Sequence, residues 1–280
     1  QSPQSLTEKQ KKETQELQHK LKLKGIYFKK LNRRIQKASS KDSTPQLIFG
    51  IKAPESFEAL ELTVHYKLSF KQGYSTGLFL DMRDNRQRLL TNLIEPNFSI
   101  FDRSLRAPSV LNTFSYTCSL SLCAAKIGAT TTNIDLSKKY LDWGKDNFKR
   151  NNINPKDHDF IYGDTFDWMK RLNKKGILYD LVILDPPTFS RSKTSGLFQA
   201  KKHYEMLANA ASKLVINNGI LLACCNTSTF SLSNFKSNVR HGVLKGGRKI
   251  IQSVHSTQPI DFPSSAEEPA YLKAYWLRLN

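Results

Sequence analysis

From Ser109 to the end of the chain, short segments rich in β-branched and apolar residues alternate with segments of helical periodicity. The strand-like segments are 109–115, 130–137, 158–164, 179–187, 219–225, 248–255 and 271–279. The helical patterns lie between them, at 119–129, 138–153, 165–176, 203–215 and 231–244. This alternation predicts a doubly wound, mostly parallel α/β sheet whose last strand is antiparallel. Such sheets bind ligands at the carboxyl ends of their strands, so functional residues are expected where strands end.

The chain before this alternation is expected to form two further parts. Residues 1–46 are rich in Lys and Gln with few apolar positions, which predicts a basic, mostly solvated helix or helix pair followed by a linker at 39–45. Residues 47–106 contain several short strand-like runs and predict a small α+β subdomain. The domain that holds the main sheet is then expected to be residues 107–280.

Within the second part, alternating apolar and polar residues predict strands at 46–53, 61–70 and 77–81. A turn is expected at 71–73, because Lys-Gln-Gly interrupts the pattern there. Apolar residues at helical spacing predict a helix at 84–93, and the stretch from there to Pro108 is expected to be a loop.

The chain is strongly basic, with 43 Lys and Arg against 24 Asp and Glu and a formal net charge of +19. A charge of this size indicates a polyanionic partner or an anionic membrane surface. The excess is largest in residues 1–46, which hold twelve Lys or Arg and four Asp or Glu. No apolar run approaches the roughly 20 residues that cross a bilayer, so no membrane span is expected.

The four cysteines form no Cys-x-x-Cys pair and no zinc spacing with the six histidines, so no metal site is expected. Unpaired cysteines favour a reducing compartment, which predicts a cytoplasmic protein. The chain begins with Gln1, so an organellar targeting segment upstream stays possible.

The first strand-to-helix turn, residues 112–119, is polar and contains no glycine. A pyrophosphate needs glycines to approach the backbone closely, so NAD and FAD do not fit this turn. A cofactor without phosphates tolerates such a turn, and a polar loop with no ligand is the plain alternative.

Two carboxylates follow the next two strands. Asp135 comes about 20 residues after the first turn, where nucleoside-binding α/β folds place the carboxylate that accepts hydrogen bonds from ribose hydroxyls. Asp164 is in register to meet an adenine amino group. Either residue could instead cap the helix that follows it, and Ser137 could cap the helix after Asp135 equally well.

The sequence Asp185-Pro186-Pro187-Thr188-Phe189 directly follows a continuous apolar run. Two prolines remove two backbone donors and restrict φ, which predicts a rigid, extended loop that holds Asp185 toward the cleft. Phe189 would then be free to stack on a planar base. Prolines also commonly end strands, but this combination favours methyl transfer to a base.

Taken together, these motifs resemble the class I S-adenosylmethionine-dependent 23S rRNA methyltransferases. The nearest types are the K-type guanine-N7 enzymes, the second half of a fused K/L protein, and the I-type cytosine-C5 enzymes. The resemblance is carried by residues 76–86, 110–117, 130–152, 163–164 and 180–193. It implies a Rossmann-like methyltransferase fold, S-adenosylmethionine as cofactor and large-subunit rRNA as partner. The basic residues 1–46 would then contact RNA phosphates, or form only an exposed helix.

The resemblance also implies roles for individual residues. The cofactor-binding residues would be Asp81, Arg83, Phe114, Ser115, Tyr116, Thr117, Asp135, Leu136, Ser137, Asp164, Thr165 and Asp185. Within this set, Arg83 would pair with the cofactor carboxylate. The catalytic residues would be Asp185, Pro186, Pro187, Phe189 and Asn226. The chain departs from the family where a glycine usually follows Ser-Tyr-Thr, because it has Cys118 and Ser119 there.

The methylated atom follows from the residue after the strand at 219–225. Cytosine C5 is a poor nucleophile, so its enzymes add a Cys thiolate to C6, whereas guanine N7 has an exposed lone pair and needs only correct positioning. Asn226 falls where the I-type enzymes have their Cys, and Cys225 is expected on the opposite face of the strand. The sequence therefore favours guanine N7. A methyltransferase acting on DNA or protein, or an inactive cofactor-binding RNA assembly factor, stays open.

Overall fold

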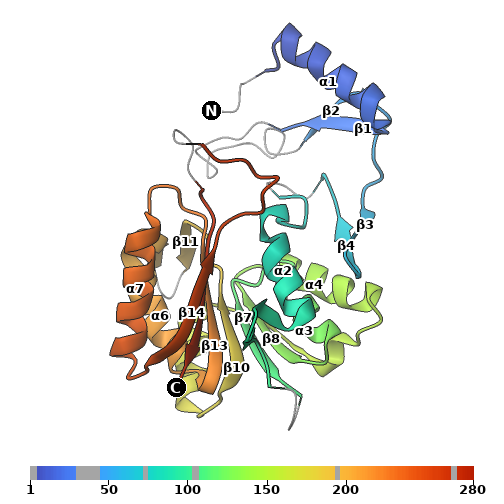
Figure 1. Ribbon diagram of the computed structural model, residues 1–280. Helices are drawn as coiled ribbons and strands as arrows, with labels where there is room; N and C mark the ends of the chain where they lie inside the picture. The colour runs from blue at the N-terminus through green and yellow to red at the C-terminus, as the bar shows by residue number, and fades with distance from the viewer. Residues whose placement is uncertain (1–4, 30–44, 72–74, 103–106, 193–195, 266–269) are drawn as a thin grey trace. The chain divides into compact units, whose positions relative to one another are not determined.

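The computed structural model of the chain describes residues 5–29, 45–71, 75–102, 107–192, 196–265 and 270–280 (Figure 1). The chain forms two compact units, Gln1–Phe79 and Leu80–Asn280. The domain boundaries expected from the sequence, after residues 46 and 106, stay a prediction. None of the helices among the described residues has both the length and the apolar character needed to cross a bilayer.

The first unit begins with a basic helix, α1 (Glu8–Leu21), as the composition predicts. Thr7 and Gln10 form a capping box at its start, which satisfies backbone N–H groups that lack helical partners. The chain then forms strand β1 (Gly25–Phe28), which pairs antiparallel with β2 (Gln46–Gly50). The predicted helix or helix pair is therefore interrupted by a strand at Gly25–Phe28. A second helix after that strand and the linker up to residue 44 lie outside the described residues.

A second antiparallel pair in this unit comprises β3 (Phe57–Glu61) and β4 (Val64–Leu68). The strand predicted at 61–70 is shorter in the structure, where it corresponds to β4. Its first residue, Glu61, ends β3, and Leu62 has a positive φ of 56° in the turn between the two strands. The expected turn at 71–73 falls mostly on residues 72–74, outside the described residues. The predicted strand at 77–81 is wrong, since Leu80–Met82 form the 3-10 helix η2.

The second unit contains a seven-stranded sheet in the order β14-β15-β13-β10-β7-β8-β9. Its strands are β7 (Ser109–Thr113), β8 (Thr130–Asp135), β9 (Asp159–Tyr162), β10 (Tyr179–Leu184), β13 (Val215–Cys225), β14 (Ile250–Ser256) and β15 (Lys273–Leu279). Parallel pairs join β13, β10, β7, β8 and β9, and β15 lies antiparallel to both β13 and β14. The predicted mostly parallel sheet with an antiparallel last strand is confirmed.

Six α-helices of this unit form two layers, one on each face of the sheet (Figure 1). One layer comprises α2 (Arg83–Thr91), α3 (Ser119–Lys126) and α4 (Lys138–Arg150). The other comprises α5 (Thr165–Lys174), α6 (Ala200–Ser212) and α7 (Leu232–Lys245). Because helices cover both faces, the central strands are apolar throughout, and Leu181 to Leu184 of β10 are fully buried.

Short pieces of structure replace two segments that were expected to be irregular. The loop expected before Pro108 contains the antiparallel pair β5 (Leu93–Glu95) and β6 (Phe98–Ser99). The segment after the two prolines forms an antiparallel hairpin of β11 (Phe189–Ser192) and β12 (Gly196–Gln199). A single-turn 3-10 helix, η3 (Pro155–Asp157), precedes β9.

Candidate functional site

The carboxyl ends of five neighbouring strands meet at one edge of the large sheet. The register aligns them, because Leu184 pairs with both Thr113 and Ala223, and Asp135 pairs with Tyr162. The residues that follow these strand ends are therefore neighbours although they are far apart in sequence. All the sequence-predicted site residues after β7, β8, β9, β10 and β13 lie at this edge.

The turn between β7 and α3 adopts an unusual backbone conformation without any glycine. Phe114, Tyr116 and Cys118 have φ values of 54°, 49° and 60°, in the left-handed region that L-residues rarely occupy. The Ser115 N–H donates to the Ile134 carbonyl oxygen at 3.0 Å, and the Cys118 N–H donates to the Ser115 carbonyl oxygen at 2.7 Å. Three strained residues in one turn indicate a shape that the surrounding structure enforces, as is common at binding sites.

Cys118 follows the turn at 114–117, and Gly144 of α4 makes room for its side chain. A Cβ added at Gly144 of α4 would lie 2.6 Å from the Cys118 Sγ and 3.1 Å from its Cβ. The Cys118 side chain is fully buried, and burial raises the pKa of its thiol. The departure from the family pattern is therefore compensated across the α3–α4 layer.

We expect Gly144→Ala to lower the free energy of unfolding by about 1–3 kcal/mol, because the new methyl group overlaps the buried thiol. In a Cys118→Gly background the same substitution should stabilise the protein by about 1 kcal/mol, the usual gain of Ala over Gly within a helix. Urea unfolding of the four proteins of this cycle measures both values. An equal effect in the two backgrounds would show that the two residues are not coupled.

Asp135, at the end of β8, binds the backbone of the turn that precedes α3. Its Oδ2 accepts a hydrogen bond from the Tyr116 N–H at 2.9 Å, and its Oδ1 accepts one from the Ser137 N–H at 2.8 Å. Burial raises the pKa of Asp135, while these two hydrogen bonds oppose the rise. Each oxygen of a carboxylate can accept two hydrogen bonds, so this arrangement leaves acceptor capacity for a ligand's hydroxyl groups.

The helix-cap alternative holds for Ser137 and Asp164. Ser137 accepts a hydrogen bond from the Tyr140 N–H at the start of α4. Asp164 caps α5, because its Oδ1 accepts hydrogen bonds from the N–H groups of Phe166 at 2.9 Å and Asp167 at 3.2 Å. A role of Asp164 toward adenine, with buried Thr165 beside it, stays a prediction.

Asp185 follows β10 and is partly accessible to solvent. Its pKa is raised to about 7, mainly by burial and to a smaller extent by the negative charge of nearby Asp81. Asp81 in turn accepts a hydrogen bond from the Tyr271 hydroxyl at 3.0 Å, and burial and Asp81 raise the pKa of Tyr271 to about 12. Two neighbouring carboxylates in a poorly solvated place form a site that favours a cationic group.

The segment after Asp185 presents an aromatic ring. Pro186 is buried and Pro187 is exposed, while the Phe189 side chain at the start of β11 is 65% exposed. Asp185 to Thr188 form the expected loop, and the chain pairs with β12 from Phe189 onward. Phe189 is nevertheless accessible, as stacking requires.

Asn226, after β13, lies beside this segment. The Thr188 hydroxyl donates to Asn226 Oδ1 at 3.3 Å and lies 3.0 Å from the Thr227 hydroxyl oxygen. The structure therefore brings the end of β13 and the Pro-Pro segment together, as the sequence analysis expects for Asp185 and Asn226.

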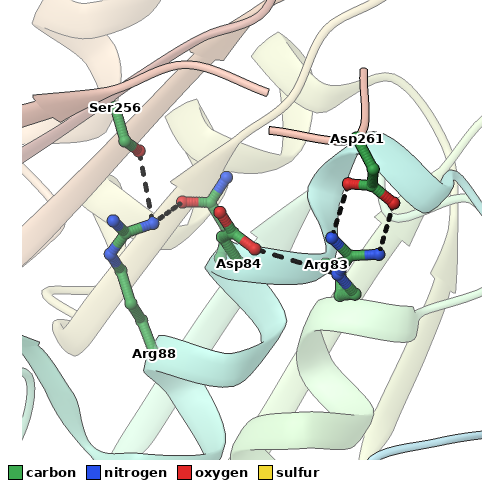
Figure 2. A network of polar contacts seen from close by, with 6 residues as sticks. Arg83, Asp84, Arg88, Ser256 and Asp261 are labelled. Atoms are coloured by element: carbon green, nitrogen blue, oxygen red, sulfur yellow. Dashed lines mark hydrogen bonds and ion pairs between the residues drawn. The ribbon is translucent and has the colours of Figure 1, made fainter. Parts of the chain in front are cut away.

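Arg83 pairs with a carboxylate of the chain itself, so its role toward the cofactor stays a prediction. Its guanidinium forms two hydrogen bonds with the carboxylate of Asp261, at 2.9 Å and 2.6 Å (Figure 2). Two further contacts join α2 to the C-terminal segments, from Arg88 to the Ser256 hydroxyl at 3.3 Å and from the Trp276 indole N–H to Asn85 at 3.1 Å. In this arrangement Asp261 holds the guanidinium that was expected to bind the cofactor carboxylate.

Two residues at this edge, Tyr271 and Lys273, have no motif in the sequence that marks them as part of the site. The ammonium of Lys273, 3% exposed, donates to the carbonyl oxygens of Thr227 at 3.0 Å and Tyr271 at 2.8 Å, and burial lowers its pKa. It thereby ties the turn after β13 to the start of β15. Both residues lie in a segment whose apolar content marks it as a strand, and only the antiparallel pairing of β15 shows that this strand begins at the site.

None of the four cysteines reaches this edge of the sheet with an accessible thiol. Cys118, Cys123, Cys224 and Cys225 are all 0% exposed. Burial raises the pKa of Cys224 well above that of a free thiol, and nearby negative charges add to the rise. Within the part of the chain that the structure describes, no group of three or more His, Cys, Asp or Glu side chains could hold a metal ion.

A mostly parallel sheet with one antiparallel strand, a glycine-free first turn and a carboxylate after the second strand fit an enzyme that binds a nucleoside without a pyrophosphate. Comparison with known families agrees. Residues 29–244 match the S-adenosylmethionine-dependent methyltransferases, and the chain belongs to this family. The resemblance, the enzyme class and the cofactor expected from the sequence are confirmed at this level.

Relatives can be named more closely. The chain is 32% identical over 218 residues to YwbD of Bacillus subtilis, which is provisionally named a ribosomal RNA large subunit methyltransferase. The aligned residues cover 77% of this chain and 52% of YwbD. It is 40% identical over 158 residues to the ribosomal RNA large subunit methyltransferase K/L of Legionella pneumophila (strain Lens), covering 56% of this chain and 20% of that one. The chain thus spans about half of YwbD and a fifth of the K/L protein.

Among solved structures, SMU.776, provisionally named a methyltransferase and crystallised with SAH, superposes with a TM-score of 0.73 at 30% identity. The match covers 84% of this chain and 58% of that one. A methyltransferase from Agrobacterium tumefaciens at 18% identity, with a TM-score of 0.70 and coverage of 93% and 79%, shows the same fold.

The residues at the strand ends fit S-adenosylmethionine. The Asp135 oxygens keep acceptor capacity for ribose hydroxyls. The Ser115 hydroxyl is buried, and among the described residues only the Cys118 thiol, a weak hydrogen-bonding group, lies near it. The sulfonium group of the cofactor is a cation, which matches the paired carboxylates of Asp81 and Asp185.

Proposed function

We propose that this chain methylates a base of large-subunit ribosomal RNA, and that the methylated atom is guanine N7. The relatives named for large-subunit rRNA methylation support the substrate class. The inaccessibility of all four thiols carries the choice of atom, because methylation at cytosine C5 needs a thiolate that can reach C6. Such an enzyme works where large ribosomal subunits assemble, in the cytoplasm or in an organelle.

When bound, S-adenosylmethionine supplies a methyl group on a positively charged sulfur. Asp135, the turn at 114–117 and the helix start at Asp164 and Thr165 would hold its nucleoside and methionine parts, with Leu136 and Ser137 beside them. Phe189 would stack on the guanine, and Pro186 and Pro187 would restrict the backbone that presents it. Asn226 would hydrogen-bond to the edge of the base, at the place where the I-type enzymes attack with a thiolate.

Asp185 would act through its charge. Methylation at N7 leaves a positive charge on the guanine ring, and an ionised carboxylate beside the base stabilises that charge as it develops. No proton has to leave N7, so the site needs no general base for the transfer. Positioning and charge stabilisation suffice for a nucleophile that already carries a lone pair.

The test is methyl transfer from tritiated S-adenosylmethionine to an unmodified large-subunit rRNA transcript, followed by mass spectrometry of the digested nucleosides. We expect 7-methylguanosine as the product. A 5-methylcytidine product would overturn the assignment of the atom, and transfer to DNA or protein alone would overturn the substrate class. Cofactor binding without any transfer would favour an inactive assembly factor.

The variant Cys225→Ala also tests the assignment of guanine N7 as the methylated atom. We expect this variant to keep the wild-type rate of transfer, because the thiol is fully buried. The rate under saturating cofactor and RNA measures this. A loss of 100-fold or more with an unchanged melting temperature would indicate a thiolate mechanism instead.

A further inference from the structure

One face of α7 forms a basic groove that the proposed reaction does not use. The groove has a volume of about 550 Å3 and runs from Leu232 to Leu244, with Ser233, Lys236 and Arg240 among its lining residues. A helix rises 1.5 Å per residue, so these twelve steps span roughly 18 Å. The sequence of α7 contains no acidic residue.

Two cations of the groove are held in place by an aromatic ring rather than by a carboxylate. The Lys236 ammonium lies 5.3 Å from the ring centroid of Tyr275, and the Arg240 guanidinium donates to the Tyr275 hydroxyl oxygen at 3.3 Å. The Tyr275 hydroxyl donates onward to Ser253 at 3.2 Å, which fixes the ring. Neither cation has an acidic partner within ion-pair distance among the described residues, so their positive charge is oriented but not neutralised.

The far end of the same helix differs. The carboxylate of Glu205 from α6 offsets the charge of Lys245, and the His241 ring lies 4.0 Å from the same carboxylate. The uncompensated charge of the groove is thus that of Lys236 and Arg240. Figure 1 shows α7 beside α6 on one face of the sheet.

The start of α7 is connected directly to the candidate site. Strand β13 ends at Cys225, Asn226 contacts the Pro-Pro segment, and Ser231 caps α7 a few residues later. Because helices in a doubly wound fold run opposite to the strands they follow, α7 begins at the site edge of the sheet and leads away from it. A polymer whose base lies at the site could therefore continue along this groove.

We propose that the α7 groove binds the sugar–phosphate backbone of the RNA next to the target base, with Lys236 and Arg240 contacting phosphates. The inference rests on the proposed function for its substrate. Lysine and arginine bind phosphate without reading sequence, and the Ser233 and Ser237 hydroxyls can donate to the same oxygens. The groove adds affinity and sets the direction in which the strand leaves the site.

The test compares Lys236→Gln/Arg240→Gln with the wild-type protein in binding to poly(U) between 50 and 300 mM salt. Each lost phosphate contact lowers the slope of log K against log salt by about 0.7 on a single strand, so we expect a slope smaller by about 1.4 and roughly tenfold weaker binding at 0.1 M salt. A matched control, Lys174→Gln/Lys175→Gln, removes two exposed charges at the end of α5, the opposite edge of the sheet. Its slope should stay close to that of the wild type.

A charge-conserving variant, Lys236→Arg/Arg240→Lys, should restore most of the slope, and the melting temperature of each variant verifies folding. An unchanged slope in the groove variant, an equal fall in the control, or no poly(U) binding by the wild type would each overturn the inference. Methyl transfer to the large-subunit transcript is measured in parallel. Transfer by the wild type with an unchanged KM in the groove variant leaves the proposed function intact and refutes the groove. A groove-dependent slope without any transfer refutes the function alone.

Discussion

Replacing Asp185 with asparagine is expected to lower kcat/KM for methyl transfer by about 100-fold and to abolish its dependence on pH near neutrality. The magnitude is that of removing one preorganised electrostatic group from a reaction that develops charge. The pKa of Asp185 in the free protein is about 7. Since kcat/KM reports the groups of the free enzyme, the wild-type value should rise about tenfold per pH unit below pH 7 and level off above it.

Asp81→Asn provides the matched control for this profile. Asn still accepts the hydrogen bond from Tyr271 but removes the negative charge that helps to raise the pKa of Asp185. The midpoint of the profile should therefore move to lower pH, with burial as the remaining cause of the rise. An Asp185→Asn variant with the wild-type profile, or an unmoved midpoint in Asp81→Asn, would refute the electrostatic role.

Ionisation of Asp185 is expected to raise kcat/KM but to lower the free energy of unfolding as the pH rises. The pKa of Asp185 in the folded state is raised to about 7, whereas the ordinary pKa of an aspartate is 3.8. Between these two pH values the folded state binds more protons than the unfolded state, so the free energy of unfolding falls as the pH rises. The total effect is about 4 kcal/mol at most. Urea unfolding at pH 4 and pH 8 should show this loss in the wild type and not in Asp185→Asn.

Asp135→Ala is expected to weaken binding of S-adenosylmethionine by 100-fold or more and to lower the free energy of unfolding by about 3–6 kcal/mol. The substitution leaves the N–H groups of Tyr116 and Ser137 without their acceptor, and each lost bond to a charged group costs about 1.5–3 kcal/mol. Tyr116 is in the left-handed region, so the turn should relax once this bond is gone. Calorimetric titration with cofactor and urea unfolding give the two values.

Asp180 supplies a control of the same chemistry at the other edge of the same sheet. Its Oδ2 accepts hydrogen bonds from the Ser109 N–H at 2.8 Å and the Ser109 hydroxyl at 2.9 Å. Asp180→Ala should therefore lower stability by a similar amount while the affinity for cofactor stays within about twofold. Equal losses of affinity in the two variants would mean that Asp135 acts on the fold alone and does not bind the cofactor.

The order of strands and helices in the larger unit could be predicted from residue patterns. Apolar runs such as Leu181–Leu184 and polar residues directly after them are local features, and a parallel sheet brings its carboxyl ends to one edge wherever the helices lie. The positions of Asp135, Asp185 and Asn226 at that edge follow from this rule. Short elements near Gly25, Leu80 and Phe98 could not be predicted, because each consists of only a few residues and depends on its pairing partner.

The roles of contacts between distant segments depended on the folded chain. Nothing local indicates that Asp261 pairs with Arg83, that Tyr271 binds Asp81, or that Gly144 gives space to Cys118. These partners are separated by 26 to 190 positions, so no periodicity or motif connects them. Strand periodicity and the chemistry of strand ends suffice for the fold class and the cofactor. Ion pairs, pKa values and the oriented cations of α7 arise only when packing removes water and brings remote side chains together.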